Sequence, residues 1–68
     1  MKIEIRANAE TFEIEDGTSV EDFIRKIGVD IKRCVVELNG DVLKREKFSG
    51  TALKSGDVLE IMQIVAGG

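Results

Sequence analysis

Apolar and polar residues alternate through the first 15 positions of the chain, with the two-residue period of a half-buried β-strand. One alternation covers residues 2–7 and a second covers residues 11–15. Because only Asn8, Ala9 and Glu10 separate the two runs, they predict an antiparallel hairpin. The side chains expected on its inner face are Ile3, Ile5, Ala7, Phe12 and Ile14.

A helix is predicted to follow this hairpin. Asp16-Gly17 interrupts the strand pattern, and the spacing from Thr18 to Glu21 is that of a capping box, whose side chains satisfy backbone amides at a helix start. Gly28 suits the left-handed residue that often ends a helix. The predicted apolar stripe, at i, i+3, i+4 and i+7, consists of Val20, Phe23, Ile24 and Ile27.

A second hairpin is predicted around Asn39-Gly40, a pair that tolerates positive φ at both positions. The apolar run 33–38 leads into this turn, and Val42 and Leu43 begin the return strand. Residues 44–55 are polar and irregular.

Phe48 and Leu53 are the expected core anchors of that irregular stretch. Residues 54–57 read as a tight turn, and residues 58–65 as the last strand. The order strand, strand, helix, strand, short strand, strand indicates an α+β fold of the β-grasp (ubiquitin-like) type. We expect one domain over residues 1–68, with a mixed four- to five-stranded sheet and one main helix packed on one face.

Composition narrows the function classes. At 68 residues, with 43% hydrophobic and 34% charged residues, the chain suits one small soluble domain. Ten basic and 13 acidic residues are interspersed and give a net charge of -3, and three Phe are the only aromatic residues, which argues against nucleic-acid binding. No apolar run reaches membrane-spanning length and no signal-like apolar region follows Met1, so we expect a cytoplasmic protein with no membrane partner.

The residue types present argue against a catalytic role. With one Cys and no His, there is neither a thiolate–imidazole pair nor a Cys/His zinc cluster, and Cys34 in its apolar run reads as a small core residue. Glu13, Glu15 and Asp16 could be taken for an acid/base or metal cluster, but the alternation places Glu13 and Glu15 on the solvent face. We expect no catalytic residue and no metal site.

The last residues, Ala66-Gly67-Gly68, are the strongest candidate site. Two glycines after an apolar strand would present the α-carboxylate of Gly68 on a thin, flexible tail able to enter a narrow active site. A carboxylate is a poor electrophile, so another protein must activate it, for which adenylation with ATP is the expected route. The activated carbonyl could then pass to an amine, as in protein conjugation, or to a sulfur nucleophile; composition leaves both open.

The last strand also predicts a docking surface. If Leu59 and Ile61 face the helix, then Glu60, Met62 and Ile64 share the opposite face. Exposed apolar side chains that lead toward the tail favour a partner-binding role, for which Met is an adaptable contact. The competing interpretation is a central strand that is apolar on both faces beneath a loop.

The whole chain resembles the ubiquitin-like sulfur carriers, and among them the ThiS family of thiamin biosynthesis. The resemblance is most specific in residues 36–45, 53–61 and 63–68, where a strand, an Asn-Gly turn, a Gly-Asp turn, a strand and a terminal di-Gly follow in order. It implies that a ThiF-like enzyme adenylates Gly68 with ATP. Sulfur drawn from cysteine, through a cysteine desulfurase or another donor, then forms a thiocarboxylate that a ThiG-like thiazole synthase accepts.

The same resemblance implies that Ala66, Gly67 and Gly68 thread into partner active sites, and that the chain is a protein co-substrate rather than an enzyme. No bound cofactor is expected, and a monomer is expected because the tail must reach successive partners.

Two departures from the family pattern are present. Lys44 stands where many members have Pro before the Arg, here Arg45, and Glu37 stands where small or apolar residues are common. The absence of Pro favours ThiS over MoaD, the small subunit of molybdopterin synthase. Alternatives that stay open are a MoaD-like carrier, a carrier for transfer-RNA thiolation, and a non-catalytic β-grasp interaction module or protein modifier.

Overall fold

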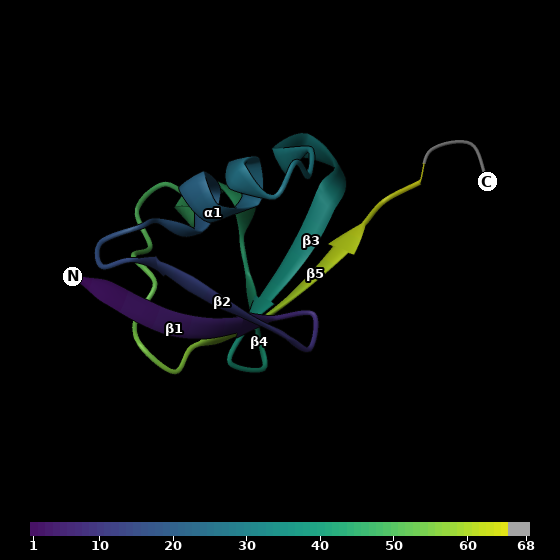
Figure 1. Cartoon of the computed structure of the whole chain (residues 1–68). Helices are drawn as coiled ribbons and strands as arrows, with labels where there is room; N and C mark the ends of the chain where they lie inside the picture. Colours follow the sequence, from purple (N-terminus) through teal and green to yellow (C-terminus); the bar gives the residue numbers. More distant parts are fainter. Residues whose placement is uncertain (66–68) are drawn as a thin grey trace.

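One α-helix lies against a five-stranded mixed sheet with the strand order β2-β1-β5-β3-β4 (Figure 1). The computed structural model describes residues 1–65. The predicted α+β architecture and the predicted order of elements are confirmed. The strands are β1 (Lys2–Ala7), β2 (Glu10–Glu15), β3 (Cys34–Leu38), β4 (Asp41–Leu43) and β5 (Val58–Gln63); the helix is α1 (Val20–Lys26), and two 3₁₀ turns are η1 (Ile31–Arg33) and η2 (Arg45–Lys47).

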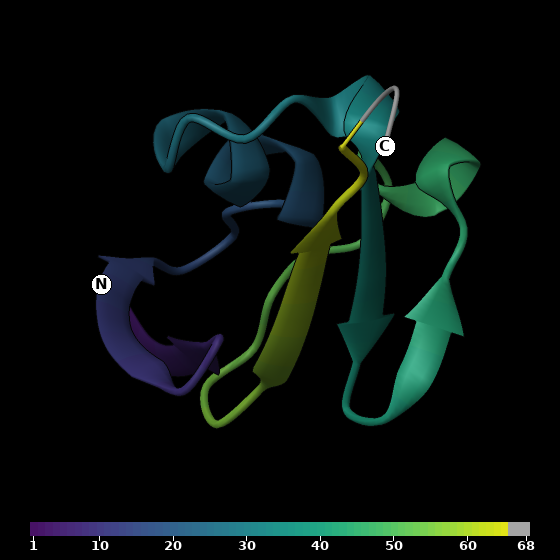
Figure 2. The ribbon, with the colours of Figure 1, turned by 90° about the vertical axis from the view of Figure 1, so that its right-hand side faces the viewer.

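The strand β5 occupies the centre of the sheet, between the β1–β2 hairpin and the β3–β4 hairpin (Figure 2). It runs parallel to β1 and antiparallel to β3. Its ladder with β1 is short, with Arg6 opposite Val58 and Ala7 opposite Leu59. Its ladder with β3 covers five residue pairs and continues to Gln63, so β3 supports the second half of β5.

Both predicted hairpins are present. The first is antiparallel, and Phe12 and Ile14 lie opposite Ile5 and Ile3 as the alternation required. In the second, Asn39 and Gly40 have φ values of 52° and 89°, the left-handed conformation that the Asn-Gly pair predicted.

The helix begins one residue later than the capping-box prediction. Ser19 is the N-cap, and its hydroxyl accepts a hydrogen bond from the backbone N–H of Asp22 at 3.0 Å. Thr18 instead donates its hydroxyl to the carbonyl of Glu15 at 2.7 Å, closing the turn after β2. Gly28, with φ of 82°, follows the helix as predicted.

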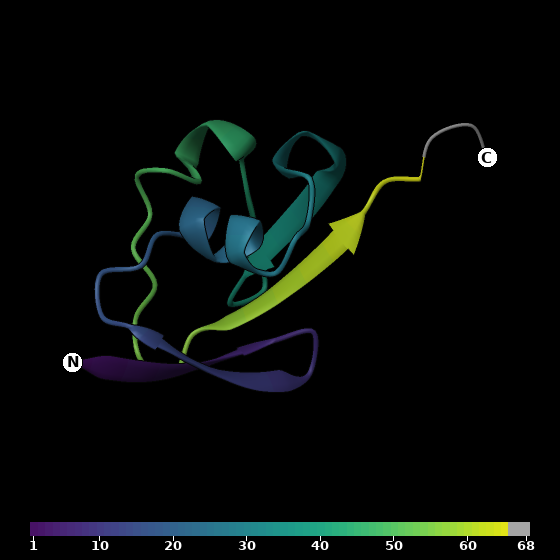
Figure 3. The same ribbon diagram turned by 45° about the horizontal axis from the view of Figure 1, so that its top comes forward.

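Figures 1 and 3 show α1 covering one face of the sheet. The core lies between the helix and that face. The rings of Phe12 and Phe23 meet edge to face, with centroids 5.1 Å apart, and join the hairpin to the helix. Phe48 and Leu53 are each 1% exposed, which confirms them as the anchors of the irregular stretch. The fully buried large side chains are Ile5, Val20, Phe23, Ile24, Val36, Phe48, Leu53 and Leu59.

The last strand is shorter than predicted. β5 ends at Gln63, whereas the apolar pattern had extended it to Val65. Cys34 is the first residue of β3 and lies opposite Gln63, so the neighbouring strand ends there too. The β3 ladder does not continue past this pair, so Ile64 and Val65 lie beyond it, although the N–H of Ile64 still donates to the carbonyl of Arg33.

Candidate functional site

The site begins where β5 leaves the sheet. On the side of β1, the side chain of Asn8 continues the ladder: Oδ1 accepts from the N–H of Ile61 at 2.7 Å, and Nδ2 donates to the carbonyl of the same residue at 3.1 Å. The backbone N–H of Asn8 also donates to the carbonyl of Leu59 at 3.0 Å. The positive φ of Asn8, 50°, lets the chain turn away toward β2 while its amide stays on β5.

On the side of β3, backbone hydrogen bonding continues further along the chain, to Ile64. The N–H of Ile64 donates to the carbonyl of Arg33 at 2.7 Å. Figure 1 shows this end of β5 projecting beyond the helix-covered part of the sheet. Ala66, Gly67 and Gly68, the predicted tail and activation site, lie outside the described residues.

The two faces of β5 divide as the alternation predicted. Leu59 and Ile61 are 0% and 6% exposed and face the core, whereas Glu60, Met62 and Ile64 are exposed. Met62 and Ile64 show about half of their surface to solvent. The docking role of these three residues stays a prediction, but the surface on which it depends is present.

The neighbouring strands enlarge this surface. Met62 lies opposite Val35 on β3, and Glu60 lies opposite Glu37. Glu37 in turn lies opposite Val42 on β4, which is 67% exposed. We call the residues Val35, Glu37, Val42, Glu60, Met62 and Ile64 the open face: two apolar areas beside a pair of carboxylates.

Sequence reasoning did not include Val35, Glu37 and Val42 in the site. The alternation of β3 carries part of the signal, because Cys34 and Val36 are buried and the residues between and after them must face outward. The register that sets Val35 against Met62 joins strands far apart in the sequence, and no local pattern reveals it.

Cys34 has the character of a core residue, as predicted. Its side chain is 3% exposed, and its Sγ donates to the carbonyl of Ile31 at 3.6 Å. Burial raises the pKa of the Cys34 thiol, and this outweighs the lowering by the nearby charge of Arg45. The thiolate, which is the reactive form, is therefore disfavoured.

The carboxylates at the end of β2 are solvated, as predicted. Glu13, Glu15 and Asp16 are exposed, and Glu15 lies 3.9 Å from the ammonium of Lys2. Within residues 1–65, no three His, Cys, Asp or Glu side chains group closely enough to hold a metal ion. In the same part of the chain, no helix has the length and apolarity needed to cross a membrane.

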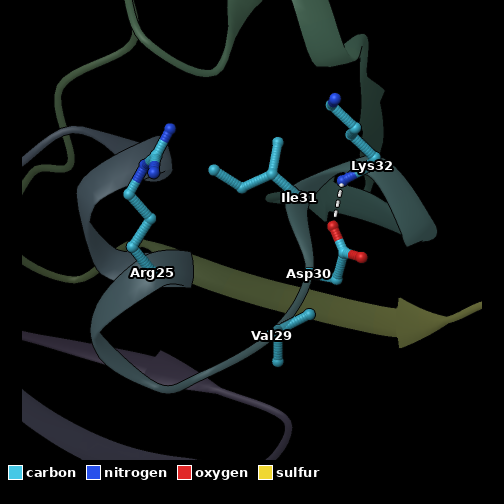
Figure 4. A pocket seen from close by; sticks show the side chains of 5 residues that line it. All are labelled: Arg25, Val29, Asp30, Ile31 and Lys32. Atoms are coloured by element: carbon cyan, nitrogen blue, oxygen red, sulfur yellow. Dashed lines mark hydrogen bonds between the residues drawn. The ribbon is translucent and has the colours of Figure 1, made fainter.

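A shallow hollow of about 470 Å³ lies beside the end of α1 (Figure 4). Two of its charged side chains, those of Asp30 and Arg25, are engaged within the fold. Asp30 Oδ1 accepts from the N–H of Lys32 at 2.9 Å, and Arg25 lies 3.3 Å from Glu21. The remaining lining residues are Val29 and Ile31. Because both charge signs are present and the side chains of Asp30 and Arg25 are engaged, the hollow has no evident ligand.

Comparison with known sequences identifies the family to which this chain belongs. The pattern of the ThiS family matches residues 3–68. A thiazole synthase of Paramagnetospirillum magneticum is 31% identical over 61 residues, which are 90% of this chain and 19% of that protein. The chain therefore spans less than a fifth of that relative's length. The uncharacterized protein ycf40 of Pyropia yezoensis is 33% identical over 66 residues, covering 97% of this chain and 93% of that protein.

Solved structures agree. The crystal structure of the thiamine biosynthesis protein ThiS from Geobacter metallireducens has a TM-score of 0.81 at 28% identity and covers 97% of this chain and 100% of its own. An N-terminal ubiquitin-like domain at 13% identity has a TM-score of 0.59, covers 100% of this chain and 78% of its own, and shows the fold alone. Because the family pattern extends through nearly every residue and the fold matches that of ThiS, the chain belongs to the ThiS family of ubiquitin-like sulfur carriers.

Proposed function

We propose that this protein carries sulfur for thiazole formation in thiamin biosynthesis, as a thiocarboxylate on Gly68. The observation that carries the proposal is the match of the ThiS family pattern through residue 68, which includes the di-Gly that follows the central strand. The exposed apolar residues of the open face, next to the exit of β5, support it because a carrier must dock before its tail can react.

The chemistry requires activation by a partner. In the proposed sequence, a carboxylate oxygen of Gly68 attacks the α-phosphorus of ATP on a ThiF-like enzyme, and pyrophosphate leaves. The outer sulfur of a persulfide, made from cysteine by a desulfurase, then attacks the acyl carbon, and AMP leaves. A thiol reduces the resulting acyl disulfide, which frees the thiocarboxylate of Gly68 and leaves a disulfide between the thiol and the persulfide carrier. A donor that supplies sulfide would give the thiocarboxylate directly. The chain contributes the acyl group and the docking surface, and the partners contribute the catalytic groups.

Thiazole synthase is the proposed acceptor. The Paramagnetospirillum magneticum relative of that name contains a segment similar to this chain within a much longer protein. Joining two components in one chain raises their effective concentration, which benefits components that react with one another. We carry this pairing over to the present chain as two separate proteins.

The open face is the proposed docking site for these partners. Met62, Val35 and Ile64 offer apolar contact, and the facing carboxylates Glu37 and Glu60 would be met by Lys or Arg on the partner. One shared face and one tail imply that a monomer binds its partners in turn.

The proposal is tested by intact mass before and after incubation with a ThiF-like enzyme, ATP, cysteine and a cysteine desulfurase. We expect the mass shift of oxygen replaced by sulfur, and fragmentation must locate it on Gly68, because oxidation of a Met gives nearly the same shift. A variant without Gly68 is the matched control and should stay unchanged. No adenylate and no shift with a competent enzyme would contradict the proposal, whereas reductant-resistant links to other proteins would support a modifier.

The docking role has its own test, Met62→Glu. A carboxylate in the apolar area should raise the KM for the carrier in the adenylation reaction about thirtyfold or more, because burying an unpaired charge at an interface costs on the order of 2 kcal/mol or more. Thr11→Glu introduces the same charge on the edge strand β2, which β1 separates from β5, and should leave KM unchanged. A folded Met62→Glu protein with unaltered KM would remove Met62 from the docking site.

A further inference from the structure

The 3₁₀ turn η1 contacts the chain at the point where it leaves β5. Its last residue, Arg33, provides the carbonyl that accepts the N–H of Ile64 at 2.7 Å. On the other side of β5, the amide of Asn8 reaches only to Ile61. The position at which the chain leaves the sheet therefore depends on where η1 holds one carbonyl group.

Arg45 holds η1 from a distant part of the sequence. Its Nε donates to the carbonyl of Ile31 at 3.1 Å and its Nη2 donates to the carbonyl of Lys32 at 3.0 Å. Carbonyls at the end of a short helical turn have no partner within the turn, and a planar guanidinium can bind two of them in fixed geometry. Three successive carbonyls, of residues 31, 32 and 33, are thus bonded by Arg45 and Ile64.

The start of η1 is fixed separately. Asp30 is its N-cap and accepts from the N–H of Lys32, the contact drawn in Figure 4. Arg45 is itself the first residue of η2, whose following residue Phe48 is 1% exposed in the core. A continuous set of contacts therefore runs from the core through Arg45 and η1 to Ile64.

We propose that Arg45 is a positioning residue for the acyl-transfer tail. By holding η1 it sets the carbonyl of Arg33, and through that carbonyl it fixes the direction in which the chain leaves β5 toward the activating enzyme. The inference rests on the proposed function for its catalytic consequence, whereas its structural part concerns Ile64 alone. Arg45 does not touch the reacting carboxylate and is not a catalytic residue.

Hydrogen exchange tests the structural part. In Arg45→Ala, we expect the Ile64 amide to exchange about fivefold faster, as for the loss of one net hydrogen bond, while the amides of Ile5 and Val36 keep their rates. In Arg45→Lys, the ammonium lacks the planar fork that spans two carbonyls in fixed geometry, so the exchange rate of the Ile64 amide should fall between those of the parent protein and Arg45→Ala. Lys44→Ala removes a neighbouring exposed cation, for which the structure of residues 1–65 gives no side-chain hydrogen bond, and should change nothing.

Steady-state adenylation tests the catalytic part. Because five of the six open-face residues, Val35, Glu37, Val42, Glu60 and Met62, keep their strand pairing in Arg45→Ala, KM for the carrier should stay within about twofold. The value of kcat should fall about fivefold or more, the effect of misplacing a reacting group. The result that overturns the inference is an unchanged Ile64 amide, a uniform rise in exchange across the core, or a change in KM alone. If the unaltered protein is not adenylated at all, the proposed function fails, and the exchange of Ile64 still decides whether Arg45 holds the exit.

Discussion

The side-chain amide of Asn8 makes the two hydrogen bonds to Ile61 that a neighbouring strand would otherwise make. Its amide bonds both backbone groups of Ile61, and these contacts are partly buried. Asn8→Ala should lower the free energy of unfolding by about 2 kcal/mol, because two backbone groups lose their partners. Urea unfolding measures the change.

Asn8→Gly separates the hydrogen bonds from the backbone conformation. Gly adopts the φ of 50° without strain but makes no side-chain contact with Ile61. We expect Asn8→Ala and Asn8→Gly to show most of the same loss in the free energy of unfolding. A stable Gly variant beside an unstable Ala variant would assign the effect to backbone strain instead.

Cys34 gives the protein a pH dependence in the alkaline range. Because burial raises the thiol pKa above its ordinary value of 9.0, folding favours the protonated form. Its contribution to stability is full below the unfolded pKa and is lost as pH rises through the folded pKa. The free energy of unfolding should therefore fall more steeply above pH 9.0 in the parent protein than in Cys34→Ala. Parallel pH profiles from urea unfolding of the two proteins would show that the thiol does not contribute.

Single residues were predictable where their role is local. Phe48 and Leu53 were identified as anchors because they are the large apolar residues in a polar stretch, and both are buried. Asn8 and Arg45 were not assigned their contacts, because the groups that they bind lie 53 residues and 13 to 14 residues away. Such contacts depend on how the chain returns to itself, which spacing along the sequence does not show.

At the scale of elements, the pairing of β3 with β5 places two like charges face to face. Glu37 lies directly opposite Glu60. Glu37→Gln should raise the free energy of unfolding by about 0.5 kcal/mol, because facing like charges destabilise a strand pair, and should also weaken docking to a basic partner surface. Urea unfolding and KM in the adenylation reaction are the two measurements.

Glu4→Gln is the matched control for this prediction. Glu4 lies opposite Glu13 in the β1–β2 hairpin, away from the open face. It should give a similar gain in stability with no change in KM. If both variants weaken docking equally, net charge rather than the open face determines binding.

The boundaries of elements were less predictable than their existence. The N-cap of the helix is Ser19 rather than Thr18, because the Thr18 hydroxyl donates to the carbonyl of Glu15. β5 stopped at Gln63 although apolar residues follow, because β3 begins at Cys34. Local patterns predict which residues are compatible with a strand, and the extent of the neighbour decides where the strand ends.

At the scale of the whole molecule, we expect the core not to depend on the predicted tail. The buried apolar residues of the described chain all lie between Ile5 and Ile61. Removing residues 66–68 should therefore change the free energy of unfolding by less than about 0.5 kcal/mol, as for surface changes, while abolishing adenylation. A loss of stability well above that value would show that the last residues contribute to the fold.

The fold class followed from the order of the predicted elements, and the family followed from the resemblance of specific motifs. Most of the open face followed from neither. The alternation of β5 was enough to identify Met62 and Ile64 as exposed. Val35, Glu37 and Val42 joined them only through the cross-strand register. The predicted tail, Ala66 to Gly68, remains a prediction that rests on the family and on its chemistry.

The central place of β5 has a mechanical consequence if the carrier is passed between enzymes as proposed. A pull applied beyond Gln63 acts along the length of β5, parallel to its own backbone. The bonds to β1, β3 and the Asn8 amide run across that direction, so they share the load together and must be sheared as a group. Withdrawal from a tight active site would thus leave the domain folded for its next encounter.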